Sequence, residues 1–382
     1  MVLTRRQFSA GLATGLSLPA LIRSSRAEGA TIKIGMVVPI TGPAAESGKY
    51  AQIGAKIALD RINKAGGVLG KQLELVIEDD QTTNPGAVLA FSKLSAQPDI
   101  VAFLGSVRST QVHAMAPDLA KVAKPMMAGG TDPTLTHEGA KWLFRCRPND
   151  SYSGRVIAAY GIETLAKKKW AVVHSTDAFG SAGAKALIAA VGDSGGTVVL
   201  DQGYPNQSQD FSSVVLAVRQ SGAEILGSYF TFETDLGIFA RQLRQLGVTV
   251  PWIGSPSITN ASALRLAGPA LYGTYGVADY TEGSSAESTE FGKQFRAAAG
   301  NVIPDNQSSW TFDAIGLLGL AINAAGSTEP AKLREALIAI KGYKGAEGEY
   351  NFDENGDGLR GYNVVRNDKG AIVFDKHVEF KA

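Results

Sequence analysis

Strand-like and helix-like stretches alternate along this chain, and no other feature constrains its fold as strongly. Residues 31–39 are rich in β-branched side chains, and apolar residues then recur at helical spacing from Tyr50 to Ile62 before Gly66 and Gly67 interrupt them. Right-handed crossovers between such units place helices on both faces of a mostly parallel sheet. Further strands are expected at 72–78, 100–104 and 125–128, with helices at 84–95 and 109–123.

A second series of alternating elements begins at Ser151. The chain has 382 residues, which is enough for more than one domain, because single domains usually contain about 100–200 residues. We therefore predict an α/β protein with two doubly wound parallel-sheet lobes. The second series is expected to have helices at 151–166, 181–191, 211–220 and 234–246, and strands at 170–174, 197–204 and 223–229.

The last hundred residues do not fit a simple tandem of two domains. Helical patterns return and are followed by short β-like segments. A chain that crosses between the lobes more than once would use this tail to complete both sheets, and several crossovers would form a hinge. The expected helices are at 288–299, 309–325 and 331–340, and the expected strands are near 348–352, 362–367 and 371–380.

Residues 1–27 have the composition of an export signal. Arg5 and Arg6 precede a bulky apolar residue, and an apolar stretch rich in small residues runs over 11–22. This stretch has roughly a dozen residues and is too short to span a bilayer, which requires about 20. We expect a twin-arginine signal peptide cleaved near Ala27 and a mature protein in the periplasm; an uncleaved membrane anchor is the alternative.

Composition narrows the classes of partner. The chain has 37 lysines and arginines against 36 aspartates and glutamates, and no long basic run, so we expect no binding to nucleic acid. Cys146 is the only cysteine, which excludes an intramolecular disulfide, a thiolate zinc site and a C-x-x-C redox motif. After the leader, no apolar run approaches the length of a membrane span.

Motifs for catalysis or metal binding are weak. The string that opens at Asp353 begins like an EF-hand loop, but its twelfth position is Val364 where a bidentate glutamate is required. Gly356, Gly358 and Gly361 satisfy G-x-G-x-x-G, yet no helix follows to hold a pyrophosphate. The chain has no G-x-S-x-G elbow and no histidine pair at metal-ligand spacing. We therefore expect no cofactor, no metal and no enzymatic activity.

Two polar loops in the first lobe form the candidate binding site. In open α/β sheets, ligands lie beyond the carboxyl ends of the strands, which here means the loops 105–110 and 129–136. Ser109 lies where the free N–H groups of a helix N-terminus favour an anion, Gly129 permits close approach of the backbone, and Thr131 adds a hydroxyl. A carboxylate would suit this site. The structural alternative is that Ser109 only caps its helix and the glycines only turn the chain.

Over nearly all of residues 31–380 the chain resembles the leucine/isoleucine/valine-type solute-binding proteins of ABC importers, which are type I periplasmic binding proteins. The resemblance is carried by motifs in the same order along the chain. They include IKIGMVVPITGPAAESG at 32–48, ALDRINKAGGVLGKQLELVIEDDQTTNPGAV at 58–88, GSVRSTQVHAMAP at 105–117, PMMAGGTDPTLT at 125–136 and VVHSTDAFGSAG at 172–183.

This resemblance implies two lobes joined by a hinge of three crossovers, near residues 150, 280 and 358. Residues 28–150 and 281–358 would form lobe 1, and residues 151–280 and 359–382 would form lobe 2. One ligand would be trapped as the cleft closes, and a monomeric protein would deliver it to a membrane ABC permease.

The resemblance also assigns ligand-binding positions. In lobe 1 the carboxylate-binding positions of the family match Ser109, Gly129 and Thr131. Lobe 2 of the family often has an aromatic residue, a tyrosine and an acidic partner for an ammonium group, where this chain has Phe179, Phe232 and Pro256. Ser47 replaces an aromatic residue that can cover the ligand, and Arg108 occupies a position where some relatives have a disulfide cysteine.

These departures leave the ammonium partner open. Glu233, Asp235 or Asp279 would supply the missing charge, unless they are solvated acids in loops or at helix starts. Arg108 would hold a carboxylate in a bidentate pair if it faces the cleft, or form a salt bridge at the surface if it does not.

We expect an extracytoplasmic binding protein for a small carboxylate, in the first place an amino acid of the branched-chain type. An aromatic carboxylate or a short amide or urea is the alternative within the class, and Phe179, Tyr229 and Phe232 would line its site. A secreted α/β hydrolase or a ligand sensor is the alternative outside it.

Overall fold

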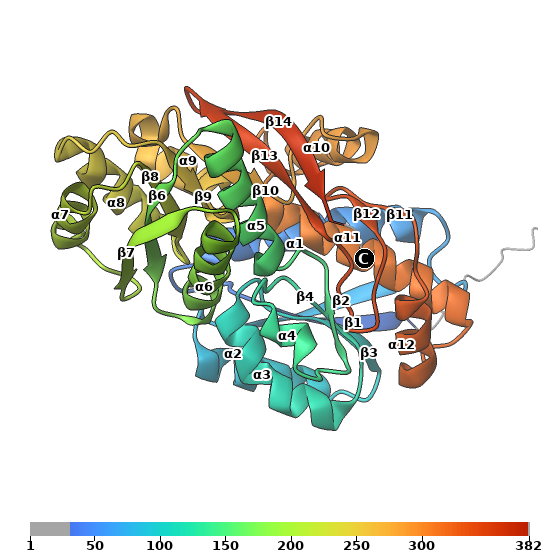
Figure 1. Ribbon diagram of the computed structural model, residues 1–382. Coiled ribbons are helices and arrows are strands. Elements are labelled where there is room, and N and C mark those ends of the chain that lie inside the picture. Colours follow the sequence, from blue (N-terminus) through green and yellow to red (C-terminus); the bar gives the residue numbers. More distant parts are fainter. Residues whose placement is uncertain (1–30, 381–382) are drawn as a thin grey trace, which may run out of the picture.

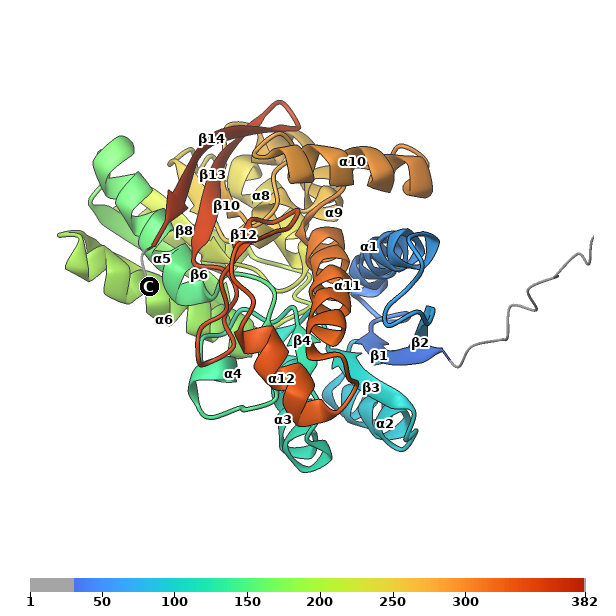
Figure 2. The same cartoon turned by 90° about the vertical axis from the view of Figure 1, so that its right-hand side faces the viewer.

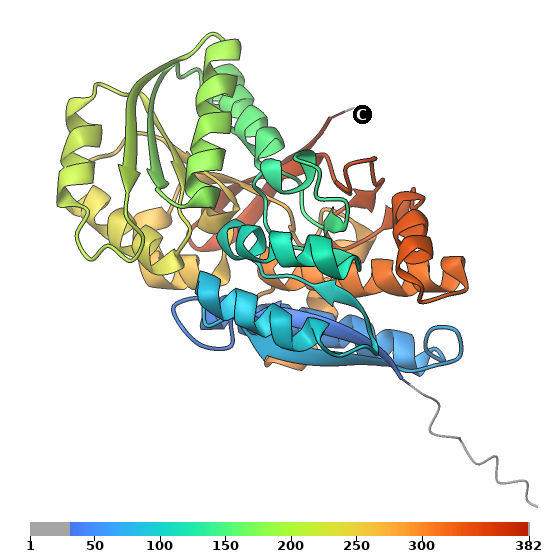
Figure 3. The same ribbon diagram turned by 90° about the horizontal axis from the view of Figure 1, so that it is seen from below.

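The computed structural model describes residues 31–380 and forms two α/β lobes, so the predicted fold class is confirmed (Figures 1 and 3). The predicted signal peptide at 1–27 lies outside the described residues. Within residues 31–380, no helix combines the length and the apolar character needed to cross a membrane.

Lobe 1 is built on a five-stranded, wholly parallel sheet with the order β2-β1-β3-β4-β5. Alternate residues of its first strand enter opposite cores: Ile34 and Met36 pack on one face, and Val37 packs on the other. The strands are β1 (Ile32–Val38), β2 (Leu73–Asp79), β3 (Ile100–Leu104), β4 (Met126–Ala128) and β5 (Leu143–Arg145), and the first helices are α1 (Ala45–Lys64), α2 (Asn84–Ser95), α3 (Ser109–Val122) and α4 (Thr134–His137).

Lobe 2 has a seven-stranded sheet with the order β14-β13-β10-β9-β8-β6-β7. Trp170 and Val172 enter the core on one face of this sheet, and Ala171 and Val173 enter the core on the other. The strands are β6 (Lys169–Ser175), β7 (Thr197–Tyr204), β8 (Ile225–Tyr229), β9 (Trp252–Gly254), β10 (Tyr275–Ala278), β13 (Gly361–Asp368) and β14 (Ala371–Glu379). The helices are α5 (Asp150–Ala159), continued by a π-helical turn (Tyr160–Thr164), α6 (Ala178–Asp193), α7 (Ser212–Gln220), α8 (Glu233–Gln245) and α9 (Ala261–Ala267), with 3₁₀ turns at Pro256–Thr259 and Gly268–Leu271.

The C-terminal tail corrects one expectation, because it completes only one of the two sheets. β13 pairs with β10, and β14 pairs with β13, both antiparallel, whereas no tail strand joins the described sheet of lobe 1. Lobe 1 instead receives helices, and α11 packs along α1 with side chains buried on nearly all sides (Figure 2). These helices are α10 (Ala286–Ala299), α11 (Asn306–Ala325) and α12 (Pro330–Ile338), and the short strands β11 (Tyr343–Lys344) and β12 (Glu349–Tyr350) pair only with each other.

The chain therefore passes between the lobes in three places, after β5, after β10 and after β12. The string that opens at Asp353 lies in the third passage and forms a turn, in which the Asp353 carboxylate accepts backbone N–H groups of Asn355 and Asp357. Asp357 in turn pairs with Arg145 at 2.8 Å, and the resulting ion pair holds the pKa of this buried carboxyl at about 2 despite its burial. The residues that open like a calcium loop thus act as hydrogen-bond partners within a passage between the lobes.

Candidate functional site

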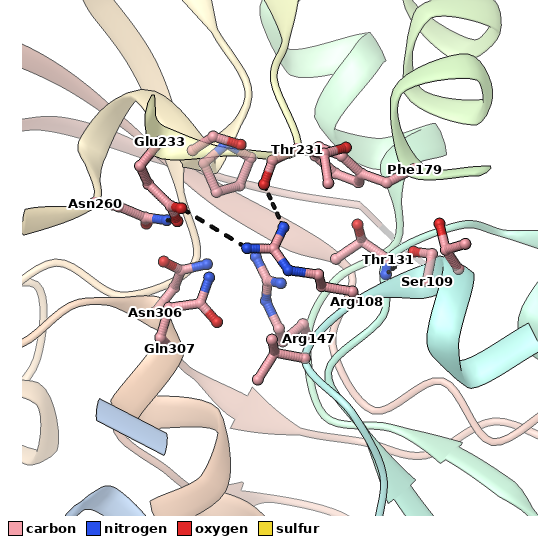
Figure 4. Close-up of a pocket in the computed structure, with 14 residues that line it drawn as sticks. Arg108, Ser109, Thr131, Arg147, Phe179, Thr231, Glu233, Asn260, Asn306 and Gln307 are labelled. Carbon is pink, nitrogen blue, oxygen red and sulfur yellow. Dashed lines mark hydrogen bonds and ion pairs between the residues drawn. The ribbon is translucent and has the colours of Figure 1, made fainter. Parts of the chain in front are cut away.

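A pocket lies between the two lobes, with walls from both of them (Figure 4). The space open to water inside it is about 40 Å³, which is room for a water molecule or two. Its walls are formed by Val107, Arg108, Ser109, Thr110, Thr131, Arg147, Phe179, Thr231, Glu233, Pro256, Ser257, Asn260, Asn306 and Gln307.

Ser109 lies in the lobe 1 wall as the first residue of α3, but it does not cap that helix. Arg108 occupies the N-cap position and makes no capping bond with its side chain. The Ser109 Oγ atom instead accepts the backbone N–H groups of Thr131 and Asp132, at 3.1 and 3.2 Å. The two loops predicted from the sequence are therefore joined through this hydroxyl, and its proton remains to donate to a ligand.

Thr131 also lines the pocket, and its Oγ1 atom donates to Asp150 Oδ2 at 2.7 Å. With Asp150 ionised, Thr131 offers a lone pair, which suits an N–H donor better than the carboxylate predicted for this position. Burial raises the pKa of Asp150 to about 7, although Thr131 and Arg147 act against this rise. Protonation of Asp150 reverses the hydrogen bond and frees the Thr131 hydroxyl to donate.

Gly129 is near the pocket but is not among the residues that line it. A Cβ atom there would lie 2.8 Å from the Trp310 ring, so the glycine allows close packing of α11 against the strand end. The Gly129 carbonyl accepts Arg147 Nη1 at 3.0 Å. Arg147 also pairs with Asp279, which therefore serves as the partner of a protein guanidinium and does not reach the ligand space.

Arg108 crosses from lobe 1 to lobe 2. Its side chain is 9% exposed, its Nη1 atom donates to the Thr231 carbonyl, and its guanidinium carbon lies 4.4 Å from the centre of the Phe232 ring. Its Nη2 atom is 3.7 Å from Glu233 Oε2. Arg108 thus faces the cleft and is not a surface salt-bridge residue, and Figure 4 shows its guanidinium in the middle of the pocket.

Glu233 is the acid that lobe 2 presents to the pocket. Its Oε1 atom accepts Asn260 Nδ2 at 2.9 Å and the Ser47 hydroxyl at 3.4 Å, so Ser47 reaches across the cleft without lining the pocket. Pro256 and Phe179 do line it. Asp235 instead accepts the backbone N–H of Gln207 at 2.8 Å and lies outside the lining.

The remaining predicted aromatic residues lie behind the pocket wall. Phe232 stacks beneath Arg108, and Tyr229 is buried against Phe179, with its hydroxyl 2.7 Å from Ser153 Oγ. Only Phe179 among the three aromatic candidates therefore lines the ligand space.

Several lining residues were not predicted from the sequence. They come from the first passage between lobes, from the ends of β8 and β9, and from the start of α11. The one signal available was Asp305, an N-cap residue that would have placed the next two residues at a helix start. The unpredicted residues are Arg147, Thr231, Ser257, Asn260, Asn306 and Gln307.

Comparison with known proteins identifies the family. The family model described as "Periplasmic binding protein" matches residues 31–371. The chain belongs to the periplasmic binding protein family. An amino acid binding protein of Pseudomonas aeruginosa is 30% identical over 339 residues, which are 86% of this chain and 87% of that protein. The leucine-, isoleucine-, valine-, threonine- and alanine-binding protein of the same organism is 28% identical, with the same coverage.

Solved structures of periplasmic binding proteins share the fold. A leucine binding protein from Thermotoga maritima superposes with a TM-score of 0.85 at 24% identity, covering 91% of this chain and 99% of that one. The resemblance stated from the sequence motifs is thus confirmed. In this periplasmic binding protein, residues 31–380 contain no cluster of three or more histidine, cysteine, aspartate or glutamate side chains that would hold a metal ion.

Proposed function

We propose that this protein is the extracytoplasmic solute-binding component of an ABC importer, and that its ligand is a small carboxylate, in the first place an amino acid of the branched-chain type. The relatives support this proposal: one is named for binding leucine, isoleucine, valine, threonine and alanine. The protein acts by binding and release, without catalysis, and a membrane ABC permease is its partner.

The observation that carries the proposal is that Ser109 of lobe 1 and Glu233 of lobe 2 line the same pocket from opposite sides. The Ser109 hydroxyl and the free N–H groups at the start of α3 suit a carboxylate. Glu233 suits an ammonium group and would replace the acid that is missing at Pro256. An α-amino acid carries both groups on one carbon and would connect the two lobes.

Ligand binding in this proposal closes a hinge formed by the passages near 150, 280 and 358, with lobe 1 as residues 28–150 and 281–358 and lobe 2 as residues 151–280 and 359–382. Small-angle scattering with and without saturating ligand measures this motion. A smaller radius of gyration with ligand is expected. An unchanged profile, with binding confirmed separately, would indicate a rigid pocket.

The proposal for the ligand is tested by calorimetry on an α-amino acid and its des-amino analogue, for example leucine and 4-methylpentanoate. Loss of the amine should weaken binding strongly, because it leaves Glu233 without its ligand partner. Equal affinity for the two would remove the amino-acid assignment and leave a carboxylate-binding protein. A thermal-shift screen of amino acids and short carboxylates finds the pair to compare, since a ligand that binds only the native state raises stability.

We also propose export by the twin-arginine pathway, with cleavage near Ala27 and a periplasmic mature protein that works as a monomer. Replacing Arg5 and Arg6 by lysine keeps the positive charge but removes the twin-arginine motif that the export pathway recognises, so the precursor should accumulate in the cytoplasm. Normal export of this double variant would exclude the pathway, and N-terminal sequencing of the exported protein locates the cleavage site.

A further inference from the structure

Five buried polar atoms around the pocket have no hydrogen-bond partner within the described chain. Two are donors, Nε and Nη2 of Arg108, and three are acceptors, Oδ1 of Asn260, Oδ1 of Asn306 and Oε1 of Gln307. All four side chains are at most 9% exposed. Figure 4 shows these side chains from both lobes around the same space.

These five unpaired atoms favour a ligand side chain that can form hydrogen bonds with them. An aliphatic side chain would leave every one of these atoms unpaired, and each buried unpaired group weakens binding about fivefold or more. A carboxylate would accept from Arg108 and from any side-chain amide that turns its nitrogen inward, but it would offer nothing to the Asn260 carbonyl, which cannot turn because Asn260 Nδ2 donates to Glu233. An ammonium group would donate to the carbonyls but would place a second cation beside Arg108.

We propose that the ligand carries a primary amide, as an amide-bearing amino acid does, and that Arg108, Asn260, Asn306 and Gln307 select it over the branched-chain side chains. This inference rests on the amino-acid part of the proposed function, because Ser109 and Glu233 still hold the carboxylate and ammonium groups, and it replaces the branched-chain side chain with an amide. The amide oxygen has two lone pairs for Arg108, and the amide nitrogen has two N–H groups for two of the three carbonyl oxygens.

The orientation of the receiving groups agrees with this match. Asn260 donates through Nδ2 to Glu233 at 2.9 Å, and since a carboxylate only accepts, the Asn260 carbonyl must point the other way. Asn306 and Gln307 begin α11 and can turn either end of their amides toward the ligand, and a primary amide pairs with either end.

Arg108 also controls how a ligand enters the pocket. Its guanidinium occupies the centre of the pocket through its bond to the Thr231 carbonyl, so a ligand enters only as Arg108 withdraws from that carbonyl.

Calorimetry on the mature protein with asparagine, aspartate and leucine tests the inference, since these three amino acids have nearly the same shape. Glutamine, glutamate and methionine repeat the comparison with one more methylene. In at least one set we expect the amide to bind about tenfold or more tightly than both partners.

Each other outcome has a defined meaning. If in both sets the acid or the apolar amino acid binds as tightly as the amide or more tightly, or the amide leads by less than tenfold, the amide inference is wrong and the proposed amino-acid function stands. If none of the six binds, and isoleucine and valine also fail in the thermal-shift screen, the proposed function itself is wrong.

A variant locates the preference. Gln307→Met keeps the length of the side chain and the backbone N–H bond to Asp305 Oδ1 at 3.0 Å, so the start of α11 should remain intact. The ratio of amide to apolar affinity should fall about fivefold or more. Gln220→Met, at the exposed end of α7, is the matched control and should leave the ratio unchanged. An unchanged ratio in a Gln307→Met protein of normal thermal stability would overturn the assignment.

Discussion

The two walls of the cleft are built in different ways. In lobe 1, Ser109 and Thr131 lie on consecutive strand-to-helix loops, and the Ser109 hydroxyl joins those loops by accepting two backbone N–H groups. In lobe 2, Glu233 is held by side chains from elsewhere, Asn260 of the same lobe and Ser47 of the other. The first wall is therefore built within one lobe, whereas the second also takes a contact from the other lobe.

This difference separates a general function from a specific one. A helix start with a free serine hydroxyl recognises any carboxylate, because it presents only donors. The Glu233 charge of lobe 2 and the side-chain amides around it, Asn260 of lobe 2 and Asn306 and Gln307 of lobe 1, decide what else the ligand carries. Changes at Glu233 should thus alter which ligand is bound, and changes at Ser109 should weaken all carboxylates alike.

The largest effect is expected from Glu233→Gln. The amide keeps an oxygen to accept from Asn260 but removes the charge opposite the ligand ammonium, so affinity for an α-amino acid should fall about 100-fold or more. Calorimetry should show a much smaller change for the des-amino acid.

Asp235→Asn is the matched control for this variant, since Asp235 is also buried at the start of α8 but lies outside the pocket lining. Its affinity should stay within about threefold of the wild type. An equal loss in both variants would mean that the charge acts on folding and not on the ligand.

The sequence predicted the lobe 1 wall because its signals are local. The order of strands and helices placed Ser109 and Thr131 after β3 and β4, and parallel strands bring such loops to one edge of a sheet. Arg108 was left open between cleft and surface, since the direction of a side chain at a helix start depends on what packs against it.

Several of the residues that line the pocket were beyond such signals. Asn306 and Gln307 enter the pocket only because α11 returns from the tail to pack along α1, a contact between distant segments. β5 and β9 have three residues each, too few to show periodicity. The strands of the C-terminal tail were predicted, but the sheet that they join was not. The alternation of apolar and polar residues along a strand does not specify the strand with which it pairs.

Ser109→Ala should weaken every carboxylate ligand to a similar degree. One hydrogen bond to a charged group contributes about 1.5–3 kcal/mol, so we expect a loss of about 10- to 150-fold for amino and des-amino acids alike. The variant also leaves the N–H groups of Thr131 and Asp132 unpaired, and its thermal stability must be measured alongside.

Ser212→Ala offers a control for this variant, because Ser212 also begins a helix but lies on α7, away from the cleft. It should bind ligand normally. If Ser109→Ala discriminates between amino and des-amino acids, the two walls do not divide their tasks as described.

A smaller effect is expected at the contact between Thr131 and Asp150, which connects the lobe 1 wall to the first passage. Burial raises the pKa of Asp150 from 3.8 to about 7. Between about pH 4 and pH 7, Asp150 is therefore protonated in the folded protein but ionised in the unfolded chain. Asp150 therefore contributes stability at low pH that is lost as the pH rises through about 7.

For one group the slope is at most about 1.4 kcal/mol per pH unit. Asp150→Asn should reduce the pH dependence of the unfolding free energy between about pH 5 and pH 6.5 by roughly this amount per unit, measured by urea denaturation. Asp305 has a pKa raised to about 7 by burial as well, so a residual slope of the same sign should remain. An unaltered slope in the variant would mean that Asp150 stays ionised throughout this range.

The smallest effect on ligand affinity is expected at the rim of the cleft, by which we mean the exposed contact between α1 and α9 outside the pocket lining. Arg265 on α9 makes a bidentate pair with Glu46 on α1, at 2.8 and 2.7 Å, and the side chains are 59% and 40% exposed. Good geometry does not make such a pair strong, because water and salt screen exposed charges and ordering two long side chains costs entropy. Glu46→Gln should therefore change ligand affinity by less than about fivefold, and the difference should disappear as the salt concentration rises from about 0.02 M to about 0.5 M.

Arg265→Gln, alone and combined with Glu46→Gln, completes a double-mutant cycle, and the coupling energy between the two side chains should be below about 1 kcal/mol. A coupling of several kcal/mol that persists at high salt would place the closing contact at the rim and not at Arg108 and Glu233, and the contrast between the two walls would then no longer explain how the cleft closes.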